Sequence, residues 1–188
     1  RRARPGESII AIDHARRALE TSDLVICDAS DPVAVAGVMG GALSEIGDAT
    51  TDVLIECAWF DPGTVRKSAR RLALHTESSH RFERGVDITR VPEVLARAVD
   101  VLVDVQRAAG ATCAPEAWTV DAYPAAFVAP IIDLDPTLAP RILGVEVAVD
   151  EQTRILRSLG LMVEAGSPLR VHVPAFRPDL TRPIDLVE

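Results

Sequence analysis

The pattern of apolar and polar positions predicts strands in the first third of the chain. Residues 8–13 and 24–28 are short runs rich in β-branched side chains, and polar residues bound each of them. Residues 32–38 (PVAVAGV) are apolar throughout, which is typical of a strand buried on both faces. Residues 52–58 (DVLIECA) form a further apolar run, and we interpret it as a strand that is interrupted by one carboxylate, Glu56.

Helical periodicity begins after these runs. Asp61 precedes Pro62, so a capping side chain stands before a proline at the first helical position. Apolar residues then recur at helical spacing, at Val65, Ala69, Leu72 and Ala73. A second helix is predicted over residues 91–109, with Gly110 as its stop. The apolar stripe of this helix consists of Val94, Leu95, Ala98, Leu102 and Val105.

A change of pattern then separates a second, smaller unit. Residues 112–130 are rich in Ala and Pro, which indicates a linker or a long irregular connection. Beyond it, short helices are predicted over residues 135–144 and 150–160, each opened by an Asp and ended by a Gly. The runs 161–164 and 169–173 predict a small hairpin.

Composition and charge place the chain among ordinary globular proteins. Of its 188 residues, 48% are hydrophobic and 26% are charged, which suits one good-sized domain or two small ones. The net charge of −8 argues against a dedicated nucleic-acid binder. Residues 62–90 differ, because seven Lys or Arg against three Asp or Glu give a local charge of +4. That stretch is either a solvated helix face or a surface that meets a phosphate backbone.

The cysteines and the ends of the chain indicate a cytosolic protein. Cys27, Cys57 and Cys113 are odd in number and widely spaced, so we expect reduced, mostly buried thiols rather than disulfides or a zinc site. The longest apolar runs are too short to span a bilayer, and no signal peptide is visible. Because no Met stands at position 1, we expect the chain to start within a longer polypeptide or after a cleaved segment.

Glu56 is the most unusual single position. A carboxylate within an apolar strand is unfavourable to bury unless a partner neutralises it. Because side chains alternate between the two faces of a strand, Glu56 would lie on the same side as Leu54 and Ala58. Three interpretations stay open, namely an ion pair with a nearby arginine, a strand with one wet face, and a functional carboxylate.

The densest polar cluster lies at residues 74–85 (LHTESSHRFERG). His75 and His80 stand five residues apart and do not share a helical face, so no metal site is predicted. A Ser–His nucleophile would need an orienting group and an oxyanion hole that the sequence does not indicate. A hydrogen-bonded turn leading into a helix and a ligand site remain as alternatives. The glycines of residues 37–41 match neither a dinucleotide-binding loop nor a Walker loop, which excludes those nucleotide sites.

Taken together, three strings of the first unit resemble the beta subunits of bacterial-type phenylalanyl-tRNA synthetases. They are GVMGG (37–41), TDVLIECAWFDP (51–62) and RRLALHTESSHRFERGVD (70–87). In the second unit RILG, LRSLG, PAFRPDL and the final DLVE resemble the fifth domain of the same subunit. The order of these strings follows the family over nearly all of the chain.

The resemblance implies two truncated domains. Residues 1–124 would form most of an α/β (α+β) editing domain, built from the family's third and fourth domains, with a mixed sheet and flanking helices. Residues 125–188 would form part of the fifth domain, a small helical and winged fold.

In this family the editing domain hydrolyses tyrosine that has been wrongly attached to the phenylalanine tRNA. Glu56 corresponds to the glutamate that meets the tyrosine hydroxyl. Thr76 and backbone amides near Gly40 would orient the attacking water or stabilise the oxyanion. Ser78 stands where the family commonly has alanine. The expected catalytic positions are therefore Thr76 and Gly40, and the expected substrate-binding positions are Glu56, Gly37, Ser78 and His75.

The resemblance also implies the partners of the whole enzyme. The alpha subunit binds ATP, Mg²⁺ and phenylalanine, and it assembles with the beta subunit into a cytoplasmic two-alpha, two-beta heterotetramer that acts on tRNA(Phe). No cofactor and no membrane contact are expected in this chain. Two alternatives are a freestanding editing-like hydrolase, against which the second-unit strings argue, and a non-catalytic module that builds the subunit interface and contacts tRNA.

Overall fold

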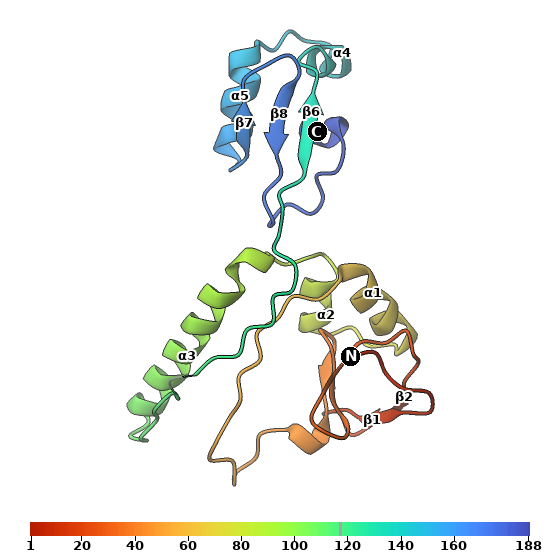
Figure 1. Ribbon diagram of the computed structural model, residues 1–188, viewed down its shortest axis with the longest axis vertical. Helices are drawn as coiled ribbons and strands as arrows, with labels where there is room; N and C mark the ends of the chain where they lie inside the picture. Colours follow the sequence, from red (N-terminus) through yellow and green to blue (C-terminus); the bar gives the residue numbers. More distant parts are fainter. Residues whose placement is uncertain (117) are drawn as a thin grey trace. The chain divides into compact units, whose positions relative to one another are not determined.

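The computed structural model describes residues 1–116 and 118–188, which divide into two compact units (Figure 1). The larger unit comprises Arg1–Val86 and Arg90–Glu116, and the smaller unit comprises Asp87–Thr89 and Ala117–Glu188. Each unit has a hydrophobic core of its own. The domain boundary expected between residues 124 and 125 stays a prediction.

Two small antiparallel sheets open the larger unit. One sheet pairs β1 (Ser8–Ile10) with β2 (Arg16–Ala18). The other has the order β3 (Val25–Cys27), β4 (Pro32–Val35) and β5 (Met39–Gly40). Successive strands are joined by short turns, and such connections produce antiparallel neighbours.

The predicted strands in this region are confirmed in shortened form, as β1, β3 and β4. The strands β2 and β5 have no counterpart in the prediction, because neither shows an apolar alternation. The expectation of a mixed sheet is wrong, since every pairing between strands in the described part of the chain is antiparallel.

The prediction of a strand at residues 52–58 is also wrong. This segment belongs to the long trace that leads from residue 45 to the first α-helix (Figure 1). Residues 52–60 make no backbone hydrogen bond with any residue that the structure describes. An apolar run becomes a strand only where a neighbouring strand supplies hydrogen-bond partners, and here none does.

Three α-helices and two short 3-10 helices follow the first five strands along the chain. They are η1 (Ala42–Ser44), α1 (Pro62–Arg71), α2 (Glu77–Phe82), η2 (Ile88–Arg90) and α3 (Val91–Ala108). Asp61 Oδ1 accepts a hydrogen bond from Thr64 N at 2.7 Å, which confirms the predicted cap of α1. The end of α3 lies one residue before the predicted end.

The core of the larger unit lies between the small sheets and α1. Val65 and Ala69 are buried, as the helical stripe predicted, whereas Ala73 follows the helix in a left-handed conformation (φ 53°) and is exposed. The buried cluster consists of Ala3, Ile9, Leu19, Val25, Val35, Val38, Val65, Ala69 and Leu74. Phe60 and Phe82 pack against this cluster with ring centroids 5.0 Å apart.

A buried carboxylate ties α1 to the first strands. Asp23 is 1% exposed and accepts hydrogen bonds from Ser68 Oγ (2.7 Å) and from the backbone N of Glu20 (2.8 Å). Its second oxygen also forms an ion pair with Arg71 at the end of α1. Three groups from two distant segments thus meet at one buried side chain, which fixes how the helix sits on the sheets.

The smaller unit is built around a three-stranded antiparallel sheet of its own. Its strands are β6 (Ile131–Leu134), β7 (Met162–Glu164) and β8 (Leu169–His172), in the order β6-β8-β7. The pairing of β7 with β8 confirms the predicted hairpin. The described residues of 112–130 form neither helix nor strand, which agrees with the linker predicted there. Ala117 lies outside the described residues.

The helices of the smaller unit are α4 (Leu138–Leu143), α5 (Val149–Ser158) and the 3-10 helix η3 (Pro183–Leu186). Both predicted helices are present. Asp150 lies in the first turn of α5 and does not cap it, because the cap residue is Ala148. Leu156 and the buried sides of β6 and β8 contribute to the second core. The winged arrangement implied by the resemblance stays a prediction.

Candidate functional site

The polar cluster of residues 74–85 forms a capped turn that leads into α2. Thr76 Oγ1 accepts a hydrogen bond from Ser79 N, and Ser79 Oγ in turn lies 3.0 Å from Thr76 N. This reciprocal pair is a capping box with serine in place of the usual acidic or amide residue. The interpretation of the cluster as a hydrogen-bonded turn before a helix is therefore confirmed.

The same threonine reaches across to the three-stranded sheet. Its hydroxyl donates a hydrogen bond of 2.7 Å to the carbonyl oxygen of Val38, which lies in the turn between β4 and β5. Because a hydroxyl has one hydrogen and two lone pairs, Thr76 Oγ1 keeps a single unused lone pair after this bond and the one from Ser79 N. Thr76 is half-buried, so that lone pair can accept from a water or a ligand.

Gly37 and Gly41 explain why this turn is rich in glycine. Gly37 has φ +68°, and a Cβ there would lie 3.0 Å from Phe60 and 3.1 Å from Val65. At Gly41 a Cβ would lie 2.7 Å from the carbonyl oxygen of Val33. Both glycines therefore allow neighbouring atoms of the protein to pack directly against the backbone.

Gly40 differs from these two glycines. It pairs with Ala34 in the sheet and is half-buried. A Cβ on Gly40 would come no closer than 3.6 Å to the nearest side chain, that of Ile12. The hydrogen bond from Thr76 to Val38 brings the start of α2 to the turn that carries Gly37 and leads into β5, the strand of Gly40. Thr76, Gly37 and Gly40 therefore belong to one local unit.

Glu56 lies on the open segment before α1. Its side chain is solvent-exposed, yet the surrounding protein atoms displace enough water to raise the pKa of its carboxyl. No residue that the structure describes forms a hydrogen bond or ion pair with this carboxyl, so the arginine pair that we considered is absent. The same carboxylate and burial together raise the pKa of the neighbouring Cys57 thiol.

His75 and Ser78 are both exposed, before and within α2. Neither side chain forms a hydrogen bond with Glu56, Gly40 or Thr76 among the described residues. The other histidine of the cluster, His80, lies 3.0 Å from Arg84 through its Nδ1. No group of three or more His, Cys, Asp or Glu in the described part of the chain is arranged to hold a metal ion.

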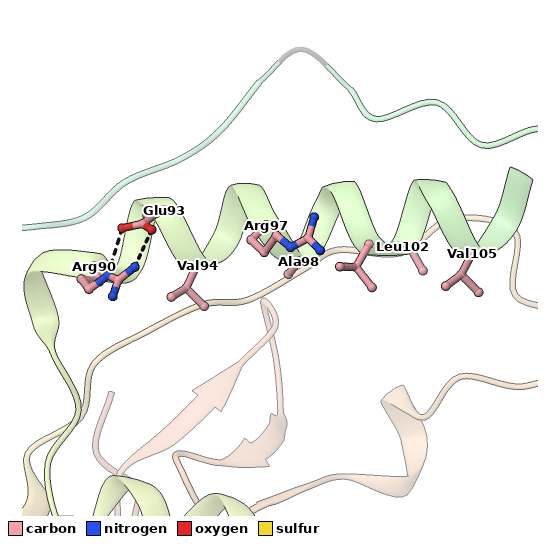
Figure 2. Close-up of a pocket in the computed structure, with 8 residues that line it drawn as sticks. Arg90, Glu93, Val94, Arg97, Ala98, Leu102 and Val105 are labelled. Carbon is pink, nitrogen blue, oxygen red and sulfur yellow. Dashed lines mark hydrogen bonds and ion pairs between the residues drawn. The ribbon is translucent and has the colours of Figure 1, made fainter.

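Two hollows in the larger unit are lined by none of the six expected positions. One, of about 550 Å³, is lined by residues of β3 and by Arg4, Ala36 and Phe60. The other, of about 620 Å³, follows one face of α3 (Figure 2). Neither hollow is lined by Glu56, Thr76 or Gly40, and the role of those residues at a common site stays a prediction.

Ser79 is not among the predicted site residues, and the predicted apolar stripe of α3 includes two side chains that are more than half exposed, those of Val94 and Val105. Ser79 is 3% exposed and completes the capping box, and a Thr-x-x-Ser spacing before a helix was the available signal. The free cysteines Cys27, Cys57 and Cys113 are half-buried rather than mostly buried. None of the helices in the described part of the chain has both the length and the apolar character needed to cross a membrane.

Comparison with known families assigns both units. Residues 1–107 match the B3/4 domain, and residues 132–188 match the tRNA synthetase B5 domain. Since the first match covers more than half of the chain, the chain belongs to the B3/4 domain family.

Curated proteins that this chain resembles include phenylalanine–tRNA ligase beta subunits. The subunit of Salinibacter ruber is 46% identical over 178 residues, which cover 94% of this chain and 21% of that subunit. Those of Moorella thermoacetica and Thermobifida fusca are 44% and 41% identical and match all of this chain, which covers 23% and 22% of their lengths. The chain thus spans about a fifth to a quarter of the relatives it matches.

Proposed function

We propose that this chain is part of the beta subunit of a cytoplasmic phenylalanine–tRNA ligase, and that its B3/4 unit removes tyrosine from mischarged tRNA(Phe). The observation that carries the editing role is the state of Glu56, whose carboxyl is partly desolvated and has no partner among the described residues. A protein keeps such a carboxylate at a free-energy cost, so a ligand that donates a hydrogen bond to it is a physical reason for its presence.

A phenol is a donor of that kind. A pocket shaped for phenylalanine rejects tyrosine weakly, because tyrosine only adds a hydroxyl group. A second site that offers Glu56 to the phenol discriminates in the opposite direction, since phenylalanine would leave the carboxylate desolvated and unpaired. The difference between the two substrates would therefore be largest at this residue.

The reaction is hydrolysis of an ester. A water oxygen attacks the carbonyl carbon, the bond to the ribose oxygen breaks, and a proton passes from the water to that oxygen, which gives free tyrosine and tRNA. We assign the remaining lone pair of Thr76 to accepting a hydrogen bond from the attacking water. Its hydrogen is already donated to Val38, so stabilisation of the oxyanion falls to backbone N–H groups near Gly40.

The basic stretch on α1 suits contact with tRNA. Arg66, Lys67 and Arg70 are exposed along the helix, whereas Arg71 is held by Asp23. Exposed Lys and Arg side chains on an acidic protein give a local patch that attracts phosphates. We propose that this face of α1 lies near the tRNA backbone.

Aminoacylation belongs to another part of the enzyme in this proposal. ATP and Mg²⁺ would bind the alpha subunit, and two alpha and two beta subunits would form the active assembly. The glycines at residues 37–41 do not fit a phosphate-binding loop, because Gly41 approaches the Val33 carbonyl and Gly37 packs on aromatic and aliphatic side chains.

The test is the Glu56→Ala variant in the full-length enzyme, with hydrolysis of preformed Tyr-tRNA(Phe) as the measurement. Loss of the phenol contact should lower kcat/KM for Tyr-tRNA at least about tenfold, which corresponds to one charge-assisted hydrogen bond. Charging of tRNA with phenylalanine should be unchanged and serves as the control. Unaltered hydrolysis would remove Glu56 from this role.

A second candidate is a non-catalytic module that supports the subunit interface and contacts tRNA. It is favoured by one observation, that neither hollow described above is lined by Glu56 or Thr76. In that case the full-length enzyme would not hydrolyse Tyr-tRNA at a rate above the spontaneous one.

A further inference from the structure

Ser79 is a buried residue whose hydroxyl and N–H both point back to Thr76. Its hydroxyl donates a hydrogen bond of 3.0 Å to the carbonyl oxygen of Thr76 and accepts one of 3.0 Å from the Thr76 backbone N–H. The backbone N–H of Ser79 donates to Thr76 Oγ1, also at 3.0 Å. At 3% exposed, Ser79 is too buried to meet a tRNA substrate. Its influence on a bound substrate therefore passes through the residue that it holds.

The bonds from the Ser79 hydroxyl restrict the backbone of Thr76. A hydroxyl that bonds both the N–H and the C=O of one residue limits the φ and ψ of that residue, which for Thr76 are −106° and 160°. The rotamers open to a side chain depend in turn on its φ and ψ. The conformation of the Thr76 side chain is therefore set in part by the Ser79 hydroxyl.

The side chain of Thr76 is held from a second direction by the sheet. Thr76 Oγ1 donates to the carbonyl oxygen of Val38 at 2.7 Å and accepts from the N–H of Ser79. Because a hydroxyl has one hydrogen and two lone pairs, these two bonds leave one lone pair and fix its direction. A group that is held in this way before a ligand arrives has little freedom left to lose when it binds a water.

We propose that Ser79 is a positioning residue of the candidate site, whose hydroxyl holds Thr76 in the one conformation that presents its free lone pair. The expected effect on rate rests on the proposed function, whereas the conformation of Thr76 is a property of the enzyme without substrate. A serine that only completes a capping box would affect the stability of the helix end. Positioning differs from capping because removal of the hydroxyl also gives Thr76 a second side-chain conformation.

Three variants of the full-length enzyme separate these roles. Ser79→Ala removes the hydroxyl and keeps the backbone N–H that caps through Thr76 Oγ1. Ser68→Ala is the matched control, because Ser68 is also buried, at 4% exposed, and its hydroxyl donates to Asp23 rather than to Thr76. Ser79→Thr keeps a hydroxyl, which in a helix can bond the carbonyl oxygen three residues earlier, and is the variant that should rescue.

The first measurement is the NMR signal of the Thr76 methyl group in the full-length enzyme without substrate, after isotope labelling of threonine methyl groups. Thr76→Ser lacks this methyl group and so identifies the signal. In Ser79→Ala the signal should split or move, because a second side-chain conformation becomes populated. Ser68→Ala should leave it in place, and Ser79→Thr should show one Thr76 signal. A single signal at the wild-type position in Ser79→Ala overturns the inference.

The second measurement is hydrolysis of preformed Tyr-tRNA(Phe) by the same enzymes. Ser79→Ala should lower kcat at least about tenfold and leave KM within about twofold, since a small displacement of a group that orients water slows the chemical step. Ser68→Ala should keep the wild-type kcat, and Ser79→Thr should recover most of it. When Thr76 is already valine, Ser79→Ala should have no further effect on kcat, because the two residues act as a unit. A tenfold loss that persists in the Thr76→Val enzyme would contradict positioning through Thr76.

The two measurements separate this inference from the editing role. If Thr76→Val hydrolyses Tyr-tRNA as fast as the wild type, the assignment of Thr76 to the attacking water fails, and the methyl signal alone decides whether Ser79 positions Thr76. If Thr76→Val is slow while Ser79→Ala keeps both the wild-type signal and the wild-type rate, the editing role stands and the inference about Ser79 falls.

Discussion

Thr76 Oγ1 donates a hydrogen bond of 2.7 Å to the carbonyl oxygen of Val38. The two residues are 38 positions apart in sequence, and this bond joins the start of α2 to the turn between β4 and β5. The same oxygen accepts from Ser79 N, so one side chain both caps a helix and fixes the glycine-rich turn. The position of Gly40 relative to α2 therefore depends on Thr76.

Thr76→Val keeps the shape of the side chain and removes both hydrogen bonds. We expect the free energy of unfolding to fall by about 1–2 kcal/mol, from loss of the helix cap and from the unpaired Val38 carbonyl. Chemical denaturation of the chain measures this change. Thr76→Ser retains the hydroxyl and should stay within about 0.5 kcal/mol of the wild type, as a substitution that preserves the cap.

The same pair of variants tests the catalytic assignment in the full-length enzyme. If Thr76 positions water, Thr76→Val should lower kcat for Tyr-tRNA hydrolysis with little change in KM, and Thr76→Ser should restore most of the rate. Equal rates in all three enzymes would limit Thr76 to a structural role.

Gly37 combines a left-handed backbone with tight packing. In Gly37→Ala the new Cβ would meet Phe60 at 3.0 Å, Val65 at 3.1 Å and Phe82 at 3.3 Å, at φ +68°. We expect a loss of about 2–4 kcal/mol, from backbone strain and overpacking together. Gly6→Ala is the matched control, because Gly6 has φ +79° and no atom within 4 Å of a Cβ. Gly6→Ala should lower the free energy of unfolding only by the cost of the left-handed backbone, about 1 kcal/mol. Equal losses in the two variants would show that packing at Gly37 is unimportant.

Asp23→Ala removes the buried centre that joins α1 to the first strands. The change leaves Ser68 Oγ and the Glu20 N–H without their acceptor and frees Arg71 from its buried partner. We expect destabilisation by about 3 kcal/mol, at the lower end for a broken buried ion pair, because Arg71 is itself partly exposed. Thermal unfolding of the chain measures the loss. Glu151→Ala, which breaks the exposed ion pair with Arg154, should change the midpoint far less.

Local signals in the sequence were sufficient to predict the start of α1 and the extent of α3. The Asp61–Pro62 pair defines the start of α1, and a regular apolar stripe defines α3 to within one residue. Both signals depend on neighbours within a few positions, which is why they can be read without the fold. The hairpin of β7 and β8 is local in the same sense.

Features that depend on distant residues were not predictable in this way. Residues 52–58 have the composition of a strand, but pairing requires a neighbour that composition cannot supply. The bond between Thr76 and Val38 has no local signal at all. Glu56 was identified as unusual from its apolar surroundings, whereas the absence of an arginine partner among the described residues became clear only from the structure.

The pH dependence of the proposed Tyr-tRNA hydrolysis is the sharpest test of Glu56, because burial raises the pKa of its carboxyl above the ordinary value of 4.5. A raised pKa means that the folded protein holds the proton more tightly than the unfolded chain, so ionisation of Glu56 lowers stability as pH rises through the folded pKa. The ionised form is also the stronger acceptor for the tyrosine hydroxyl.

We therefore expect kcat/KM for Tyr-tRNA hydrolysis to fall on acidification, starting at a higher pH than an ordinary glutamate would give. In Glu56→Gln this acidic limb should disappear, the rate should be lower at neutral pH, and the stability should be equal to or slightly above that of the wild type. A pH–rate profile of the full-length enzyme from pH 4.5 to 8 measures the effect, with phenylalanine charging as the control. The same acidic limb in wild type and Glu56→Gln would assign the titration to another group and leave Glu56 without a role in recognising the phenol.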